Sequence, residues 1–139
     1  MKRKPLVASV LLVAFAIACG PGFAASKDDE HGEKVMAATN KAEARQWLKD
    51  SSRHLIFKGD RKEVVKLVED FYKAGATKVF ICDIESHDGN DYAGGLLIVL
   101  PKDSDARGKV FKVAEKADTA FENDPTKDEG QKYIYYAFD

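Results

Sequence analysis

Residues 61–74 most constrain how this chain can fold, because they carry the complete pattern of an amphipathic helix. Asp60 can cap the first turn, and Glu63 stands at the position that completes a capping box. Valine, leucine and aromatic residues recur through the segment at helical spacing, so one side of the helix must be buried. Gly75 then supplies the left-handed backbone that commonly ends a helix. A helix with such a face requires a sheet or a second helix to cover it.

Apolar segments on both sides of this helix can provide that cover. A second helix is predicted at 105–121 and a short one, capped by Asn40, at 41–49. The run Leu96–Leu100 contains no polar residue, which predicts a central strand. Turn-forming residues at 86–91 predict a hairpin between the second and third strands. The predicted strands are 54–58, 78–85, 92–100 and 132–138.

After the short helix, the order of these elements is strand, helix, strand, strand, helix, strand. We therefore predict an α+β domain of the ferredoxin-like, split β-α-β-β-α-β type. It would contain a four-stranded antiparallel sheet with two helices on one face. The first and third strands would lie at the centre of the sheet, and the last strand at an edge. The predicted division of the chain is an export signal at 1–25, a flexible linker at 26–39 and a single domain at 40–139.

The N-terminal segment has the composition of an export signal. Three cations at residues 2–4 precede an unbroken run of 13 apolar or small residues, 6–18. This length matches the hydrophobic region of a signal peptide and is too short to span a bilayer. We expect an exported bacterial envelope protein that is periplasmic or secreted, or is anchored at the outer membrane as a lipoprotein.

Two routes for removing this signal remain open. The stretch Ala16-Ile17-Ala18-Cys19 resembles a bacterial lipobox, with alanine where leucine is usual, and this resemblance implies lipidation of Cys19. The alternative is ordinary cleavage near residues 24–26, where small residues have suitable spacings. Contact with a membrane would depend on the lipid anchor alone.

The cysteine and charge content exclude several classes of protein. After either route Cys82 is the only unmodified cysteine, so no intramolecular disulfide is available. Its apolar strand predicts that it is a small buried hydrophobic residue. Three of the 22 basic residues lie in the signal, which leaves 19 basic against 23 acidic side chains in the rest of the chain. Because this balance is acidic, we predict no nucleic-acid partner.

The densest group of polar residues lies around the predicted hairpin. Carboxylates at this density could bind a hard cation such as calcium. Their spacing does not fit an EF-hand, however, and an exposed hairpin tip is where solvated acids are expected. We therefore predict no metal site and no cofactor. The candidate ligands are Asp83, Glu85, His87, Asp88 and Asp91.

No catalytic residues are predicted either. The three histidines fall in the linker, at the start of a strand and at the hairpin tip. Five residues of extended strand would separate Cys82 from His87 by roughly 16 Å, too far for a nucleophile and its base.

These observations favour a small non-catalytic module that binds a protein, a second copy of itself or a small ligand. The alternative is a small metal-dependent enzyme or cation-binding protein that uses the hairpin 83–91. The sheet face left free by the two main helices lacks polar residues at alternate positions, so part of it should be an interaction surface. The short helix at 41–49 would cover the rest. The residues expected at this surface are Trp47, Leu48, Tyr133 and Tyr135.

Overall fold

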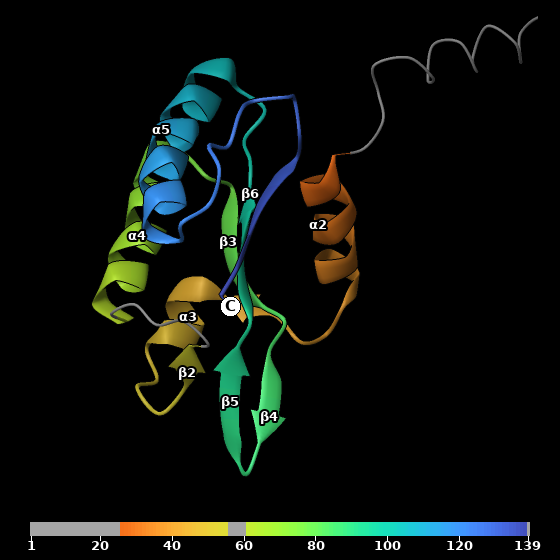
Figure 1. Cartoon of the computed structure of the whole chain (residues 1–139), viewed down its shortest axis with the longest axis vertical. Helices are drawn as coiled ribbons and strands as arrows, with labels where there is room; N and C mark the ends of the chain where they lie inside the picture. The colour runs from red at the N-terminus through yellow and green to blue at the C-terminus, as the bar shows by residue number, and fades with distance from the viewer. Residues whose placement is uncertain (1–25, 56–60, 139) are drawn as a thin grey trace, which may run out of the picture.

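The computed structural model describes residues 26–55 and 61–138 (Figure 1). The predicted export signal with Cys19, the predicted cap Asp60 and residues 56–58 of the first predicted strand lie outside this range. The helices are α2 (Lys27–Ala37), α3 (Ala44–Leu48), α4 (Arg61–Ala74) and α5 (Ser104–Ala120). The strands are β1 (Ala42–Glu43), β2 (His54–Leu55), β3 (Lys78–Cys82), β4 (Glu85–His87), β5 (Asn90–Ala93), β6 (Gly95–Val99) and β7 (Tyr133–Ala137).

Four strands form the main sheet in the order β1-β3-β6-β7, and every neighbouring pair is antiparallel. This confirms the predicted α+β class with a four-stranded antiparallel sheet. β6 lies inside the sheet, as its apolar sequence predicts, and Leu96, Leu97 and Ile98 are fully buried. β7 forms one edge, also as predicted.

The strand order does not match the ferredoxin-like prediction, which placed the first strand at the centre of the sheet. β7 instead pairs directly with β6, while β2 pairs in parallel with β5 in a separate sheet, β2-β5-β4. The two sheets separate where the backbone bends between β3 and β4 at Asp83, whose φ is 53°. Gly94 lies opposite, between β5 and β6, and a Cβ there would come 2.9 Å from the Asp83 carbonyl oxygen. Only glycine allows the two backbone segments to approach this closely.

The predicted hairpin is confirmed. Asp88 and Gly89, with φ values of 53° and 79°, connect β4 to β5, and His87 pairs with Asn90 beside them. A two-residue hairpin turn needs left-handed backbone at both central positions, which the Asp-Gly pair tolerates. This hairpin projects from the body of the molecule (Figure 1).

One face of the main sheet is covered by α4 and α5 (Figure 1). α4 has the predicted bounds and buries Val64, Leu67, Val68 and Phe71, and Gly75 has a φ of 115° after it. Phe71 is completely inaccessible to solvent. Start, buried face and end therefore agree with the amphipathic pattern.

The short helix α3 belongs to the same core, so the prediction that it covers the opposite face was wrong. Trp47 is 3% exposed and Leu48 8% exposed, and both are members of the cluster that contains the α4 and α5 side chains. α3 is also shorter than predicted. Glu43, not Asn40, caps it, because the Glu43 carboxylate accepts hydrogen bonds from two backbone N–H groups of the first turn.

The opposite face is covered by α2, in the segment predicted to be a flexible linker (Figure 1). Ser26 caps this helix, and three acidic residues in its first turn favour it through the helix dipole. Gly32 and Val35 are its two buried residues, so the helical pattern in the sequence was weak. The cluster of buried residues that α2 completes consists of Val35, Cys82, Leu97 and Tyr133.

Carboxylates of α2 also occupy the outer edge of β7. Asp29 Oδ1 accepts hydrogen bonds from the backbone N–H groups of Lys132 (2.8 Å) and Tyr133 (3.1 Å), and Asp28 Oδ2 accepts one from Tyr135 (3.4 Å). Burial raises the pKa of the Asp28 carboxyl, and the charge of Asp29 adds to this effect. These contacts satisfy N–H groups that would otherwise be open to another strand.

Candidate ligand-binding groove between α3 and α4

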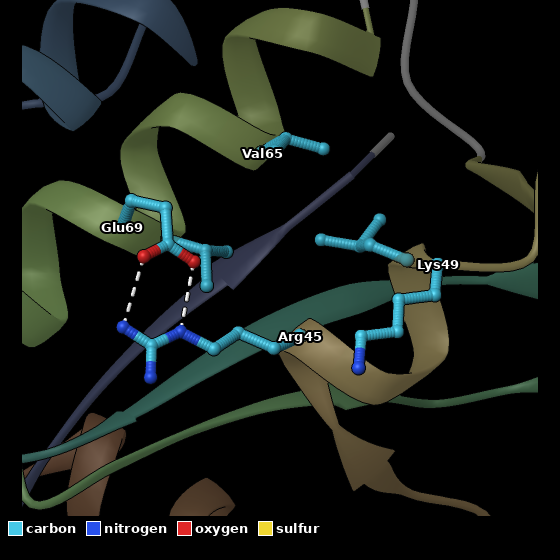
Figure 2. A pocket seen from close by; sticks show the side chains of 6 residues that line it. Arg45, Lys49, Val65 and Glu69 are labelled. Atoms are coloured by element: carbon cyan, nitrogen blue, oxygen red, sulfur yellow. Dashed lines mark hydrogen bonds and ion pairs between the residues drawn. The ribbon is translucent and has the colours of Figure 1, made fainter.

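A groove of about 320 Å³ lies between α3 and the middle of α4 (Figure 2). Each helix contributes apolar side chains to its walls and charged side chains to its rim. The lining residues are Arg45, Leu48, Lys49, Val65, Val68 and Glu69.

Arg61 fixes α3 relative to α4. It is the first residue of α4, and its guanidinium donates hydrogen bonds to the carbonyl oxygens of Leu48 (2.8 Å), Asp50 (2.9 Å) and Arg53 (2.7 Å). Carbonyl groups at the end of a helix lack partners within it, so one cation here satisfies several of them. This bracing sets the spacing between the two walls of the groove.

The walls are aliphatic. Leu48 and Val68 are buried, whereas Val65 is 38% exposed and extends from α4 into the open space (Figure 2). Within residues 26–55 and 61–138, the only other large hydrophobic side chain this exposed is Met36 of α2. The groove therefore presents apolar surface where a helix would ordinarily present polar side chains.

One end of the rim is closed by a paired arginine and glutamate. Arg45 Nε and Nη2 donate to the two carboxylate oxygens of Glu69 at 2.8 Å and 2.9 Å (Figure 2). These hydrogen bonds lower the pKa of the Glu69 carboxyl. The Arg45 guanidinium also lies 4.1 Å from the centre of the Tyr72 ring. Two carboxylate contacts and one aromatic contact hold Arg45 in place.

Tyr72 connects this end of the groove to the main sheet. Its hydroxyl donates to Glu43 Oε2 at 2.6 Å and accepts a hydrogen bond from the Val79 N–H at 3.0 Å. Burial, together with the neighbouring Glu43 carboxylate, raises the pKa of Tyr72 to about 12. The phenol therefore stays protonated at physiological pH and fixes α4 against β3.

Lys49 supplies the remaining charge of the rim. It is exposed, and its amine forms no ion pair with any residue that the structure describes. The nearest acid in the sequence, Asp50, is engaged by Ser52 and by Arg53. The mouth of the groove thus carries one cation that no acid in residues 26–55 or 61–138 neutralises.

The hairpin residues considered as metal ligands do not converge on one point. Glu85 pairs with His87 at 3.1 Å, and Asp91 accepts a hydrogen bond from Ser86. Asp83 lies at the bend away from them. Among the described residues, no three His, Cys, Asp or Glu side chains form a group that could hold a metal ion.

Asp83 belongs to a different cluster, which the sequence did not indicate. Its Oδ2 accepts a hydrogen bond from the Tyr135 hydroxyl at 2.6 Å and lies 3.4 Å from His31 Nε2. The His31 and Tyr135 rings are 3.8 Å apart between centres. These three side chains come from α2, β7 and the bend after β3, so the cluster fastens α2 to the sheet.

Cys82 is buried, as predicted, and burial raises the pKa of its thiol far above the usual range. The neighbouring Asp83 carboxylate acts in the same direction. A thiol that stays protonated is a poor nucleophile. The side chain therefore serves packing under α2.

The four residues predicted to share an interaction surface lie on opposite sides of the main sheet. Trp47 and Leu48 belong to the core on the α4 side. Tyr133 is buried under α2, and Tyr135 is partly buried beside it. The face on which we expected a partner is occupied in large part by α2.

Sequence reasoning missed the groove, although one signal was present. Val65 interrupts the otherwise charged outer side of the helix 61–74. A lone exposed valine is common, so its meaning depends on α3 lying beside it.

The fold and the groove together define an α+β domain with a small groove whose walls are aliphatic and whose rim is charged. Comparison with known protein families, curated proteins and solved structures finds no match. In the described part of the chain, no helix has the length and apolar character needed to cross a membrane.

Proposed function

We propose that this protein is an exported, non-catalytic binding module whose ligand occupies the groove between α3 and α4. The observation that carries the proposal is the exposed aliphatic wall at Val65, which lines a hollow of about 320 Å³. This volume lies at the lower end of the range for small-molecule sites, which are typically apolar with a few polar groups.

Export is supported by the basic start and the apolar run at residues 6–18. The mature protein would work in the bacterial envelope, free or anchored through a lipid on Cys19. The acidic balance of the remaining chain accords with a protein that has no nucleic-acid partner.

A binding role is favoured over catalysis by the chemistry of the groove. Its six lining side chains include no cysteine, serine or histidine. The Tyr72 hydroxyl, beside the Arg45 end of the groove, is engaged by Glu43 and Val79. Arg45 and Glu69 are engaged with each other, so neither is available as an acid or a base.

The proposal is tested by titrating the protein with 1-octanol and recording amide chemical shifts. We expect shifts confined to α3 and to the middle of α4, residues 65–69. Val65→Asp should abolish them, because it places a solvated charge in the aliphatic wall. Met36→Asp is the matched control, since it changes the other exposed hydrophobic side chain in the same way and should leave the shifts intact. Shifts elsewhere, or equal effects of the two substitutions, would refute the groove as the binding site.

A further inference from the structure

We infer that the groove selects an aliphatic molecule with a single anionic head group, of the medium-chain carboxylate class. This inference rests on the proposed function, because it names the ligand of the same site. It follows from the aliphatic walls, from the charge at the mouth and from the size of the hollow.

The charge at the mouth is one uncompensated cation. Glu69 neutralises Arg45 through two short hydrogen bonds, and Glu43 is held by the Tyr72 hydroxyl and by the first turn of α3. Lys49 is left with no acidic partner among the described residues. An anion at the mouth would gain a partner there, whereas a cation would meet Lys49 with nothing to offset the repulsion.

The paired arginine limits the ligand to one negative charge. A second anionic group would have to displace Glu69 from Arg45, which would break two hydrogen bonds and leave the carboxylate without its partner. Arg45 is also held over the Tyr72 ring. A polyanion at the rim could therefore pair with Lys49 but not also with Arg45.

The walls and the volume define the rest of the molecule. Leu48, Val65 and Val68 offer aliphatic contacts and no hydrogen-bonding group, so a polar body such as a sugar would lose its water without replacement. A hollow of about 320 Å³ corresponds to about ten water molecules at ~30 Å³ each. A chain of the length of octanoate fits that space, and its carboxylate would lie near the open end.

The experiment compares octanoate, 1-octanol and octylamine by titration of amide shifts at low ionic strength. We expect octanoate to bind more tightly than 1-octanol by a factor of about three to five, the effect of one exposed ion pair. Octylamine should bind more weakly than 1-octanol. Added salt should reduce the preference for octanoate, because both charges are exposed.

Two substitutions locate the preference at Lys49. Lys49→Met keeps the aliphatic stem and should make octanoate and 1-octanol equal, while Lys49→Glu should reverse the order of octanoate and octylamine. Lys112→Glu on α5 makes the same change of net charge outside the groove and should leave the wild-type order unchanged. Unfolding curves for each variant confirm that the fold is retained.

The outcomes separate this inference from the proposed function. If octanoate and 1-octanol bind the wild-type groove equally, the inference is wrong and the binding role stands. If none of the three probes shifts α3 or α4, both are wrong. If Lys112→Glu alters the order as much as Lys49→Glu does, net charge sets the preference and the inference is again wrong.

Discussion

Replacing Gly32 by alanine tests whether α2 is docked as closely as the structure indicates. In a free helix, glycine to alanine is stabilising by about 0.8–1.0 kcal/mol. In this protein the new Cβ would lie 2.4 Å, 2.5 Å and 2.9 Å from Cδ2, Cγ and Cβ of Tyr133. Carbon atoms pack at about 3.5–4.0 Å, so the ring or the helix must move by roughly 1 Å.

Overpacking of this kind costs about 1–3 kcal/mol. Tyr133 is only 8% exposed and lies in a strand, so its ring has little room to turn. After subtraction of the helix gain, Gly32→Ala should lower the free energy of unfolding by about 0–2 kcal/mol. It should also increase amide exchange specifically in residues 27–37, because lifting α2 relieves the overlap.

Gly108 of α5 provides the matched control. A Cβ at Gly108 has no neighbouring atom within 4 Å, so Gly108→Ala should raise the free energy of unfolding by about 0.5–1 kcal/mol. Urea unfolding followed by the fluorescence of Trp47, the single tryptophan, measures both changes. If Gly32→Ala stabilises the protein as much as Gly108→Ala and leaves exchange in α2 unchanged, the close packing of α2 on Tyr133 is refuted.

Three further predictions follow from the core, the edge of β7 and the N-terminus. Phe71→Ala should cost about 3–5 kcal/mol in urea unfolding, because a fully buried aromatic ring is lost; a cost below about 1 kcal/mol would contradict its place in the core. Asp28→Asn should stabilise the protein at pH 7, because the folded pKa of Asp28 lies above its ordinary value of 3.8. The stability that wild type gains from the protonated carboxyl is complete below pH 3.8 and is lost as the pH rises through the folded pKa of Asp28. The free energies of unfolding of wild type and Asp28→Asn should therefore converge in acid. A constant difference between the two proteins from pH 3 to pH 7 would contradict this assignment. Intact-mass analysis of the protein isolated from a bacterial host should show either acylated Cys19 as the first residue or a start near residues 25–27, and a chain that retains Met1 would rule out both routes.

Much of the fold could be predicted because the decisive signals were local. The helix 61–74 has its periodicity and its Gly75 end within one segment, and the Asp88-Gly89 turn carries its own backbone preference. The burial of Cys82 followed from the apolar residues beside it. Each of these features depends on residues close together in the sequence.

The strand order and α2 could not be predicted, because both depend on contacts between distant segments. α2 buries only Gly32 and Val35, and its fit depends on the shape of the Tyr133 ring more than 100 positions later. β7 and the first predicted strand have similar apolar patterns, and nothing local decides which one pairs with β6. Three strands of the main sheet, β3, β6 and β7, were predicted. The fourth, β1, lies where a helix was predicted, and the first predicted strand belongs to the other sheet as β2.

The groove was hidden from the sequence for the same reason. Its apolar wall needs Leu48 and Val65 to face one another, and that depends on the hydrogen bonds of Arg61 to the end of α3. The selectivity of the rim depends on Arg45 finding Glu69, 24 residues away. A pattern of charges along the sequence cannot show which cation is neutralised and which is free.

The docking of α2 changes how far a lipid anchor would let this domain travel. A flexible segment from Cys19 to residue 39 would reach roughly 65 Å, but α2 begins at Lys27 with Ser26 as its cap, so even a fully extended connection from Cys19 to Ser26 would span at most about 25 Å. A connection of this length is shorter than many single helices, and it would hold the domain close to the bilayer surface. This connection would join the domain at the N-terminal end of α2, whereas α3 lies low on the opposite side of the molecule (Figure 1). A lipid-anchored domain would therefore keep its groove turned away from its own membrane, open to molecules that diffuse through the surrounding compartment.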